Sequence, residues 1–288
     1  MIWSDFVQQQ HSVCGFSTSD SWVVLSSIEQ SIKQKMETVG TPLKNWNINI
    51  YRGVLTGYND AFIISTEKRD EILANCATEE ERIRTAELIR PILRGRDIKR
   101  YAYEWANIWL INTHNGIKGK IERIHIEDYP TIKAHLDQYW DKISRRADKG
   151  ETPYNLRNCA YLEDFSKPKI VWGNLNLKAS YALVENFAFI NAPSPMIVPA
   201  SKFLLAVLNS KLADYYIRQL GVTRNGGYFE YKPMFVEKIP IPLHADKNLI
   251  SALEVETLTK DNSKIDALVY ELYGLDKDEI AYIEDVCR

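Results

Sequence analysis

Apolar residues recur at the three- and four-residue spacing of an amphipathic helix in several stretches of the chain. The strongest stretch runs from Lys202 to Leu220, follows Ser201 as its cap, and is apolar on most of its faces, which predicts a buried helix. Another helix begins near Thr78, where three glutamates occupy the first turn and suit the helix dipole. The remaining predicted helices cover residues 26–40, 129–149, 262–274 and 276–286.

Alternating and short apolar runs predict strands between these helices. Trp46, Ile48 and Ile50 alternate with asparagines, which is the two-residue period of a half-buried strand. Helices and strands in this irregular order predict an α+β fold, with a mixed sheet, packed helices and a short helical segment at the C-terminus. The other predicted strands lie within a strand–turn–strand pattern over 51–65 and at 107–112, 167–173, 181–184, 187–190 and 196–198.

The character of the sequence changes after Pro242. Residues 246–288 carry eleven acids and five bases, whereas residues 1–245 sum to +4 within an overall charge of −2. A basic body suits a polyanion and an acidic helical end suits a protein partner, although ordinary surface variation gives the same balance. The predicted segments are 1–44 as a lead-in with the first helix, 45–245 as the main domain and 246–288 as a helical tail.

The composition is that of a soluble globular chain, with 45% hydrophobic and 26% charged residues among 288. No apolar run approaches the roughly 20 residues that span a bilayer, and the N-terminus lacks the cationic and apolar regions of a secretion signal. Cys14, Cys76, Cys159 and Cys287 form no Cys-x-x-Cys pair and have no histidine at ligand spacing. We therefore expect reduced thiols, a cytoplasmic location and no metal site.

The stretch from Gly221 to Leu243 holds the residues best suited to a nucleic acid. It opens on an Arg-Asn-Gly-Gly turn, continues with alternating aromatics and ends on Ile-Pro-Ile-Pro, which cannot continue a helix. Adjacent glycines permit positive φ, while arginine pairs with guanine and asparagine with adenine in the major groove. The alternative is a hairpin turn with a solvated arginine. The candidate base-reading residues here are Arg224, Asn225, Gly226, Gly227 and Tyr228.

Two further stretches supply candidate DNA contacts. A glycine-bearing turn after Tyr51 suits a ligand-facing loop, although no Lys-Ser/Thr follows to make a phosphate loop. Residues 90–101 group five cations around Asp97, which suits successive phosphates, while a solvated loop explains the pattern equally well. The turn adds Thr56, Gly57 and Asn59 as base-reading candidates, and the candidate phosphate contacts, each of which is equally compatible with a surface ion pair, are Arg94, Arg96, Lys99, Arg100, Arg145, Arg146 and Lys232.

Catalytic patterns are missing from the sequence. It has no Gly-x-Ser-x-Gly elbow, no His-Glu-x-x-His and no phosphate loop. It also lacks any Pro-Pro pair, and hence the Asn-Pro-Pro-aromatic motif that holds a flipped adenine in methyltransferases. Asp97 and Lys99 form an Asp-x-Lys triplet like part of a metal-dependent nuclease, but such triplets are frequent by chance. We therefore expect no catalytic residue, no metal and no cofactor in this chain.

A series of motifs resembles the TaqI-like C-terminal specificity (target recognition) domain of adenine-specific DNA methyltransferases and fused restriction–modification enzymes. The series is also similar to the target recognition domains of type I specificity subunits. Each motif is individually modest, but the ordered set covers about residues 45–245 and is hard to produce by accident. The matching stretches are 53–62, 92–101, 129–136, 148–154, 165–172, 203–212 and 224–242.

This resemblance implies a mixed α/β module that grips double-stranded DNA across from a catalytic cleft. It also implies a parent protein whose upstream methyltransferase domain transfers a methyl group from S-adenosylmethionine to adenine N6. Base contacts vary with the target sequence, so the candidate contacts above come from side-chain chemistry alone. The competing hypothesis is a protein-interaction or scaffold domain that holds a catalytic or specificity partner and touches DNA only in the assembly.

Overall fold

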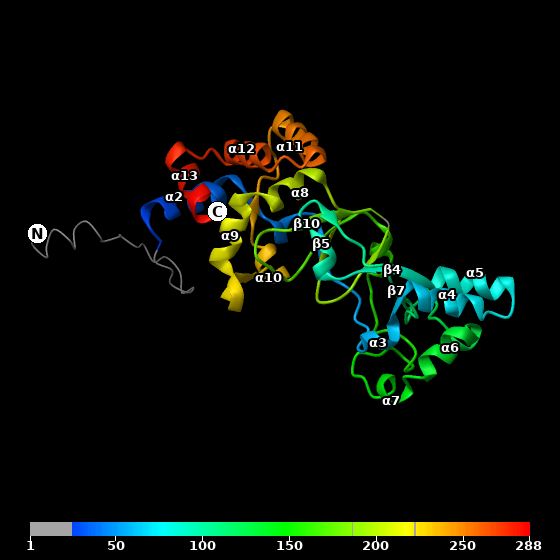
Figure 1. Ribbon diagram of the computed structural model, residues 1–288. Helices are drawn as coiled ribbons and strands as arrows, with labels where there is room; N and C mark the ends of the chain where they lie inside the picture. The colour runs from blue at the N-terminus through cyan, green and yellow to red at the C-terminus, as the bar shows by residue number, and fades with distance from the viewer. Residues whose placement is uncertain (1–24, 186, 222) are drawn as a thin grey trace, which may run out of the picture.

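The computed structural model describes residues 25–185, 187–221 and 223–288, so the first 24 residues of the predicted 1–44 segment, with Cys14, lie outside the described residues. Helices and strands follow one another irregularly, and most strand pairs are antiparallel, which confirms the predicted α+β class. Figure 1 shows helices gathered at two ends of an elongated molecule, with strands between them. Within the described residues, every helix is too short or too polar to traverse a lipid bilayer.

A four-stranded antiparallel sheet at the centre of the molecule is buried on both faces. Its strand order is β10-β8-β12-β2, and Met196 of β12 lies opposite Val171 of β8. Because successive residues of a strand point to opposite faces, Ile170 and Trp172 enter one hydrophobic cluster and Val171 enters the other. The sheet thus separates two cores. Its strands are β2 Asn49–Arg52, β8 Lys169–Trp172, β10 Tyr181–Val184 and β12 Pro195–Val198.

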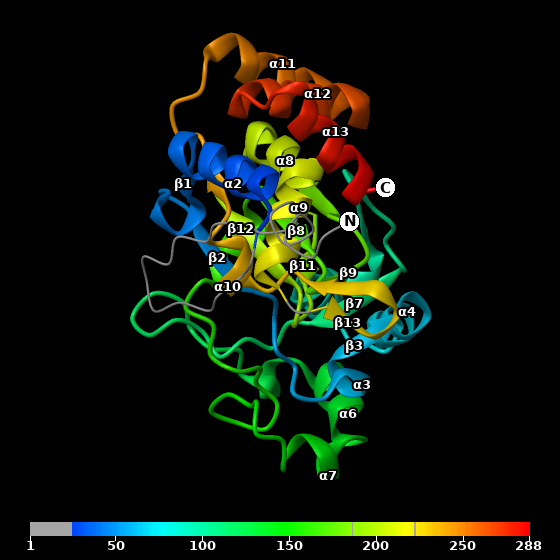
Figure 2. The same ribbon diagram turned by 90° about the vertical axis from the view of Figure 1, so that its left-hand side faces the viewer.

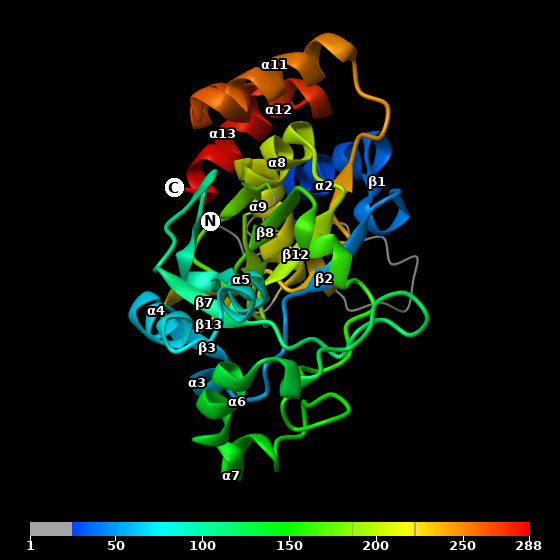
Figure 3. The same cartoon turned by 90° about the vertical axis from the view of Figure 1, so that its right-hand side faces the viewer.

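Helices from distant parts of the chain form the core on one face of this sheet, and Figure 3 shows α8 below the C-terminal helices and beside α2. The predicted first helix is confirmed, with Ser26 as its capping residue. The predicted single helix over 202–220 is wrong at its centre. Ser210 is extended there, with φ −69° and ψ 155°, and its hydroxyl accepts the Ala213 N–H to cap a second helix. The helices are α2 Ser27–Val39, α8 Lys202–Asn209 and α9 Lys211–Leu220.

The C-terminal segment packs onto this first core. Leu253, Ile265 and Ile283 are fully buried in it, and α11 packs along α8. The segment holds three helices rather than the two predicted, because α11 lacks a clear apolar stripe in the sequence. The boundaries 1–44, 45–245 and 246–288 stay a prediction. The helices are α11 Lys247–Thr259, α12 Asn262–Tyr273 and α13 Lys277–Val286.

The second core lies on the opposite face of the central sheet, around a smaller sheet of order β11-β4-β7-β3. Strand β11 runs parallel to β4, whereas β4 and β3 are antiparallel to β7. The predicted helix over 129–149 is wrong in its second half, because the backbone leaves helical geometry at Tyr139. The elements are β3 Ile63–Ser65, β4 Ile89–Leu93, β7 Ile108–Ile111, β11 Phe189–Ile190, α3 Asn59–Phe62, α4 Thr66–Ala74, α5 Glu79–Leu88, α6 Pro130–Asp137 and α7 Trp140–Ile143.

Short strand pairs fix the connections between these elements. The most important is a three-stranded ribbon of order β13-β14-β9, which carries the Arg-Asn-Gly-Gly turn. Among the described cysteines, Cys76, Cys159 and Cys287 are free thiols. The short elements are β1 Thr41–Pro42, β5 Ile98–Lys99, β6 Ala102–Tyr103, β9 Leu175–Asn176, β13 Thr223–Arg224, β14 Tyr228–Glu230, β15 Pro240–Ile241, α10 Pro233–Val236 and the 3-10 turns Leu43–Asn45, Gly95–Asp97, Ile126–Asp128, Leu162–Ser166 and Asn225–Gly227.

Candidate nucleic-acid interface

Five connecting segments lie side by side, and they include all three stretches that the sequence singles out. Val54 forms a parallel β-bridge with Asn191, and the Asn191 N–H donates to the Leu93 carbonyl at 2.8 Å. Gly95 approaches Gly173 so closely that a Cβ on Gly95 would lie 3.4 Å from Gly173 Cα. Strand β9 then pairs with β14. We call this series of neighbours the loop row, and its order is 54–59, 190–194, 93–97, 173–177 and 223–230.

The bend at residues 224–228 is open to solvent on its outer side. Gly226 and Gly227 have φ of 80° and 78°, in the left-handed region that favours glycine. A Cβ at either position would meet nothing closer than 3.6 Å, so backbone conformation rather than crowding favours glycine there. Tyr228 and Leu177, both about half exposed, add apolar surface beside the bend. The bend thus offers both polar side chains and a closely approachable backbone.

Arg224 is held in place by the carboxylate of Glu230. The Arg224 side chain is 54% exposed, whereas that of Glu230, on β14, is only 4% exposed. Arg224 Nε donates to Glu230 Oε1 at 2.6 Å, and Lys232 Nζ lies 2.8 Å from Oε2. Hydrogen bonds from Lys232 and Arg224 lower the pKa of Glu230 below its ordinary value. Two cations therefore share one carboxylate, which leaves a positive charge and fixes the direction of the guanidinium.

A buried hydrogen-bond network on α9 supports the bend from beneath. Asp214 is 4% exposed and accepts from the Tyr231 hydroxyl and from the Ala179 N–H. Arg218 pairs with Asp214 at 2.6 Å and donates to the Leu177 carbonyl at 3.0 Å. Because Leu177 follows β9 and Tyr231 follows β14, the network joins two strands of the ribbon to the buried helix α9. The bend is therefore presented from a rigid base.

In the basic turn at residues 94–100, two arginines bind other groups of the protein, whereas Arg96 and Lys99 are exposed to solvent. Arg94 pairs with buried Asp97, with Nε–Oδ2 at 3.0 Å and Nη2–Oδ1 at 2.9 Å. Arg100 is half-buried and donates from Nη2 to the last carbonyl of α8, so part of its guanidinium is used by the fold, and its phosphate contact stays a prediction. Lys99 is exposed and donates to the Arg96 carbonyl at 3.0 Å. Arg96 is also exposed, and its guanidinium has no partner among the described residues.

Arg146 is buried and closes the loop at residues 56–59 from inside. It is 7% exposed, and its guanidinium donates to the carbonyls of Thr56, Pro153 and Asn155. The guanidinium also stacks 4.2 Å over the Phe62 ring. Burial lowers the pKa of Arg146 to about 10, so the side chain stays cationic at neutral pH. The Nη1 and Nη2 donors of Arg146 bind protein carbonyls, which argues against its predicted phosphate contact, and that contact stays a prediction.

The side chains of the 56–59 loop differ in their access to solvent. Thr56 is 2% exposed and its hydroxyl donates to Asn59 Oδ1 at 2.6 Å, which argues against the predicted base contact of Thr56. Gly57 has φ of 68° and packs so closely on Asp148 that a Cβ would lie 2.8 Å from the Asp148 carbonyl oxygen. Gly57 and Asn59 themselves are exposed, as is Arg145, and their contacts with DNA stay a prediction.

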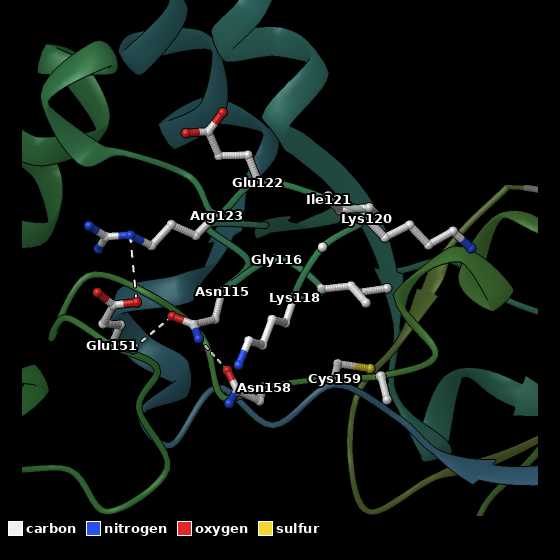
Figure 4. Close-up of a pocket in the computed structure, with 13 residues that line it drawn as sticks. Asn115, Gly116, Lys118, Lys120, Ile121, Glu122, Arg123, Glu151, Asn158 and Cys159 are labelled. Atoms are coloured by element: carbon white, nitrogen blue, oxygen red, sulfur yellow. Dashed lines mark hydrogen bonds and ion pairs between the residues drawn. The ribbon is translucent and has the colours of Figure 1, made fainter.

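A basic hairpin at residues 115–123 lines a cavity of about 920 Å³, shown in Figure 4, and sequence reasoning missed it. Its tip carries exposed Lys118 and Lys120 on either side of Gly119, and Arg123 lies on its returning side. The hairpin has no apolar periodicity long enough to identify a strand. The signal in the sequence is the Lys-Gly-Lys run between Ile117 and Ile121.

The charged groups of the nuclease-like triplet are occupied within the basic turn. Asp97 binds Arg94, and Lys99 binds a backbone carbonyl. Across the described part of the chain, no three histidine, cysteine or carboxylate side chains form a group able to hold a metal ion.

Comparison with known families identifies the domain. The model described as the TaqI-like C-terminal specificity domain matches residues 90–241, slightly more than half of the chain. The chain belongs to this family. The resemblance of the sequence motifs is thereby confirmed, and the chain is a specificity domain of the kind found in restriction–modification methyltransferases. The matched range contains the basic turn, the 173–177 segment and the bend, but not the 56–59 loop.

Three type II methyltransferases are similar to this specificity domain over most of its length. M.BstVI of Geobacillus stearothermophilus is 22% identical over 94% of the chain. M.PaeR7I of Pseudomonas aeruginosa is 22% identical and M.XhoI of Xanthomonas vasicola 21% identical, each over 91% of the chain. The chain spans 47%, 44% and 46% of the lengths of these proteins, respectively, and thus about half of each.

Two solved structures share the fold of this specificity domain. The type IIL restriction–modification enzyme MmeI, solved in complex with DNA, superimposes with a TM-score of 0.62 at 12% identity, over 85% of this chain and 36% of that one. The type IIG restriction endonuclease BpuSI superimposes with a TM-score of 0.59 at 14% identity, over 91% and 32%. At these identities the likeness concerns the fold.

Proposed function

We propose that this chain reads a DNA sequence on behalf of a larger methyltransferase. The proposal depends chiefly on one observation: Arg224 is exposed on a glycine bend, is oriented by Glu230 and is backed by the network around Asp214. Membership of a specificity-domain family and the names of the three methyltransferase relatives support it. The DNA-bound structure of a fold relative is consistent with it.

Arg224 has the geometry to read a guanine. Glu230 occupies the Nε side of the guanidinium, so Nη1 and the outer hydrogen of Nη2 point away from Glu230 and are not used by it. Two parallel N–H donors match the O6 and N7 acceptors of guanine in the major groove. Asn225 lies next to Arg224 and has the donor and acceptor that adenine requires. Arg96 and Lys232, both exposed enough to reach a backbone, are the proposed phosphate contacts nearby.

The proposed reaction of the whole protein is methylation of adenine N6 with S-adenosylmethionine as donor. Neither a glycine-rich nucleoside loop nor an Asn-Pro-Pro-aromatic motif occurs in this sequence. We therefore assign the cofactor and the target adenine to the half of the relatives that this chain does not span. The role of this chain in that reaction is to position the duplex, because contacts to base edges select the sequence and contacts to phosphates fix the register.

Selection from a random duplex pool tests the proposal. The chain is incubated at low salt with duplexes of about 30 random base pairs, and the retained fraction is sequenced. Enrichment of one short motif, with retention that falls steeply as salt rises, is the expected result. A pool that is not retained at any salt concentration would contradict sequence recognition by this chain.

A second candidate role is contact with a protein partner through α11. Val255 and Leu258 are 56% and 65% exposed there, three residues apart on an acidic helix. Deleting residues 246–288 is a poor test, since Leu253 and Ile265 belong to the first core. Replacing Leu258 with lysine leaves that core intact. Loss of association with the parent methyltransferase, with DNA retention unchanged, is the outcome that supports this role.

A further inference from the structure

The 115–123 hairpin is a rigid basic projection whose role the bend does not explain. Ile117 and Ile121 pair through reciprocal backbone hydrogen bonds of 2.8 and 2.9 Å, and Gly116 and Gly119 adopt positive φ of 69° and 74°. A Cβ on Gly116 would collide with the opposite backbone, whereas Gly119 has open space around it. The turn therefore has one fixed shape and holds the lysines on either side of Gly119 in solvent.

The base of this hairpin is anchored by Asn115. Its Oδ1 accepts the Glu151 N–H at 2.7 Å, and its Nδ2 donates to Asn158 Oδ1. Figure 4 shows Asn115 between these two partners, with the Lys118 side chain extending toward Asn158 over the cavity. Because the oxygen of Asn158 is bound to Asn115, the amide hydrogens of Asn158 stay available to a ligand. The cavity thus joins a free ammonium group with a fixed amide donor.

Positive charge predominates around this cavity. Lys118 has no ion pair within the described residues, and Lys120 is 60% exposed even though it pairs with Glu163. Glu122 is 84% exposed and in Figure 4 points away from Lys118 and Asn158. An adjoining hollow of about 600 Å³ shares Asn115, Glu151 and Asn158 and adds two cations, Lys149 and Arg157, of which Arg157 pairs with Asp148. An anion with several oxygens fits these donors better than a neutral ligand does.

The hairpin lies next to the loop row, on the side away from the bend. A small pocket is lined jointly by Val54, Asn115 and Gly116, and the Tyr161 hydroxyl donates to the Arg52 carbonyl at 3.0 Å. In Figure 2 the segment that leads from β2 to α3 descends between the hairpin on the left and β13 on the right. Basic groups therefore stand at both ends of the row, with the candidate reading loops between them.

We infer that the 115–123 hairpin binds the phosphate backbone of duplex DNA at the end of the loop row opposite the bend. Lys118 Nζ and the Asn158 amide hold one phosphate, and Lys120 contacts the next. This inference rests on the proposed function, and it adds an anchor that contributes affinity without selecting sequence, because phosphate contacts carry no base information.

The test is the salt dependence of binding to a random-sequence duplex of about 40 base pairs, measured by fluorescence anisotropy with the full chain. The test variant is Lys118→Ala/Lys120→Ala, and the matched control is Lys247→Ala/Lys277→Ala on the helical tail, which removes the same charge at the far end of the molecule. Each phosphate contact contributes about 0.9 to the log–log slope. We expect the slope to fall by about 1 to 2 in the test variant and affinity at low salt to fall about tenfold, with the control unchanged.

Two further measurements distinguish failure of the proposed anchor from failure of the proposed function and from misfolding of a variant. Lys118→Arg/Lys120→Arg keeps both charges and is expected to keep the slope, and melting curves of all variants show whether the fold is intact. If the unchanged chain binds DNA and the alanine variant keeps its slope, or if test and control lose slope equally, the anchor is overturned and the proposed function stands. If the unchanged chain binds no duplex, the proposed function fails and the anchor fails with it.

Discussion

The loop at residues 56–59 and the bend at residues 224–228 are similar in sequence but differ in structure. Both combine glycine with asparagine and a neighbouring tyrosine between strand-like segments, and both have glycines with positive φ. The 56–59 loop is filled from inside by Arg146, which binds the Thr56 carbonyl, and the Thr56 side chain is buried. The bend is supported from beneath by a network on α9, and its outer donors stay in solvent.

The comparison shows that a polar glycine loop is available to a ligand only if its hydrogen-bonding groups are not already used by the protein. The two loops differ because of one cation that comes from 90 residues further along the chain. Arg145 and Arg146 are adjacent and chemically identical, yet one is exposed and the other is buried. Position in the fold, rather than residue type, therefore decides which arginine meets solvent.

Replacing Arg146 has the largest expected effect and tests the closed loop. Arg146→Ala removes three hydrogen bonds to buried carbonyls and a stacking contact, so we expect the free energy of unfolding to fall by about 3–5 kcal/mol. The matched control is Arg145→Ala, for which a change within about 0.5 kcal/mol is expected. An equal loss of unfolding free energy in the two variants, measured by urea denaturation, would show that the 56–59 loop does not depend on the buried arginine.

Replacing Arg224 tests the open bend directly. With a target motif in hand, Arg224→Ala is expected to relax selection at one base pair, by about 1–3 kcal/mol. Asn59→Ala, in the 56–59 loop, is the comparison variant and is expected to shift selection less. The measurement is repeated sequencing of the bound pool. A variant of Arg224 that selects the same motif as strongly as the unchanged chain would remove the bend as the reading element.

Lowering the pH is expected to have a smaller effect, which acts through a histidine beside the 56–59 loop and not beside the bend. His135 Nε2 lies 3.0 Å from the Ala61 carbonyl beside the closed loop, and Nδ1 is buried without a partner among the described residues. Burial lowers the pKa of His135 below its usual 6.5. The unfolded chain then binds more protons than the folded chain below about pH 6.5, so stability falls as pH decreases. In denaturation series over pH, His135→Gln is expected to reduce this slope; an unchanged slope would contradict it.

The smallest expected effect concerns Glu230. Glu230→Gln keeps an acceptor for Arg224 but removes the charge shared by Arg224 and Lys232. We expect affinity for random DNA at low salt to rise about twofold to threefold, since a buried negative charge next to the contact surface is lost. Glu271→Gln, on the exposed side of α12, is the control. A fall in affinity instead would indicate that the orientation of Arg224 depends on the full carboxylate charge.

Much of the fold follows from local pattern in the sequence. The α2 cap, the strands of the central sheet and the helix after Ser201 are set by residues within a few positions of each other. The sequence does not reveal the break at Ser210. A serine within an apolar run can either continue a helix or bind a nearby backbone N–H and cap a new one, and the surrounding residues decide between the two. Helix α11 was missed because its burial depends on α8, which is distant in sequence.

The candidate interface was harder to predict than the fold. The bend and Arg96 are exposed as the sequence suggested, since turn residues and charges favour the surface. Arg146 and Arg100 bind carbonyl groups that tertiary packing brings close to them. These carbonyls are distant in sequence, so no local spacing of residues indicates the contacts. The partnership of Glu230 with Arg224 was within reach, because Arg224 lies opposite Tyr228 across the tight turn and Glu230, two residues further on, is its diagonal neighbour on the same face.

Hydrogen exchange of the chain with and without its selected duplex tests the central claim most directly. The account predicts that DNA protects amides within residues 223–229 and 94–99, while that of Thr56, which is already buried, changes little. Protection confined to the 56–59 loop, with the bend exchanging at its free rate, would contradict the proposal that this specificity domain reads DNA through Arg224.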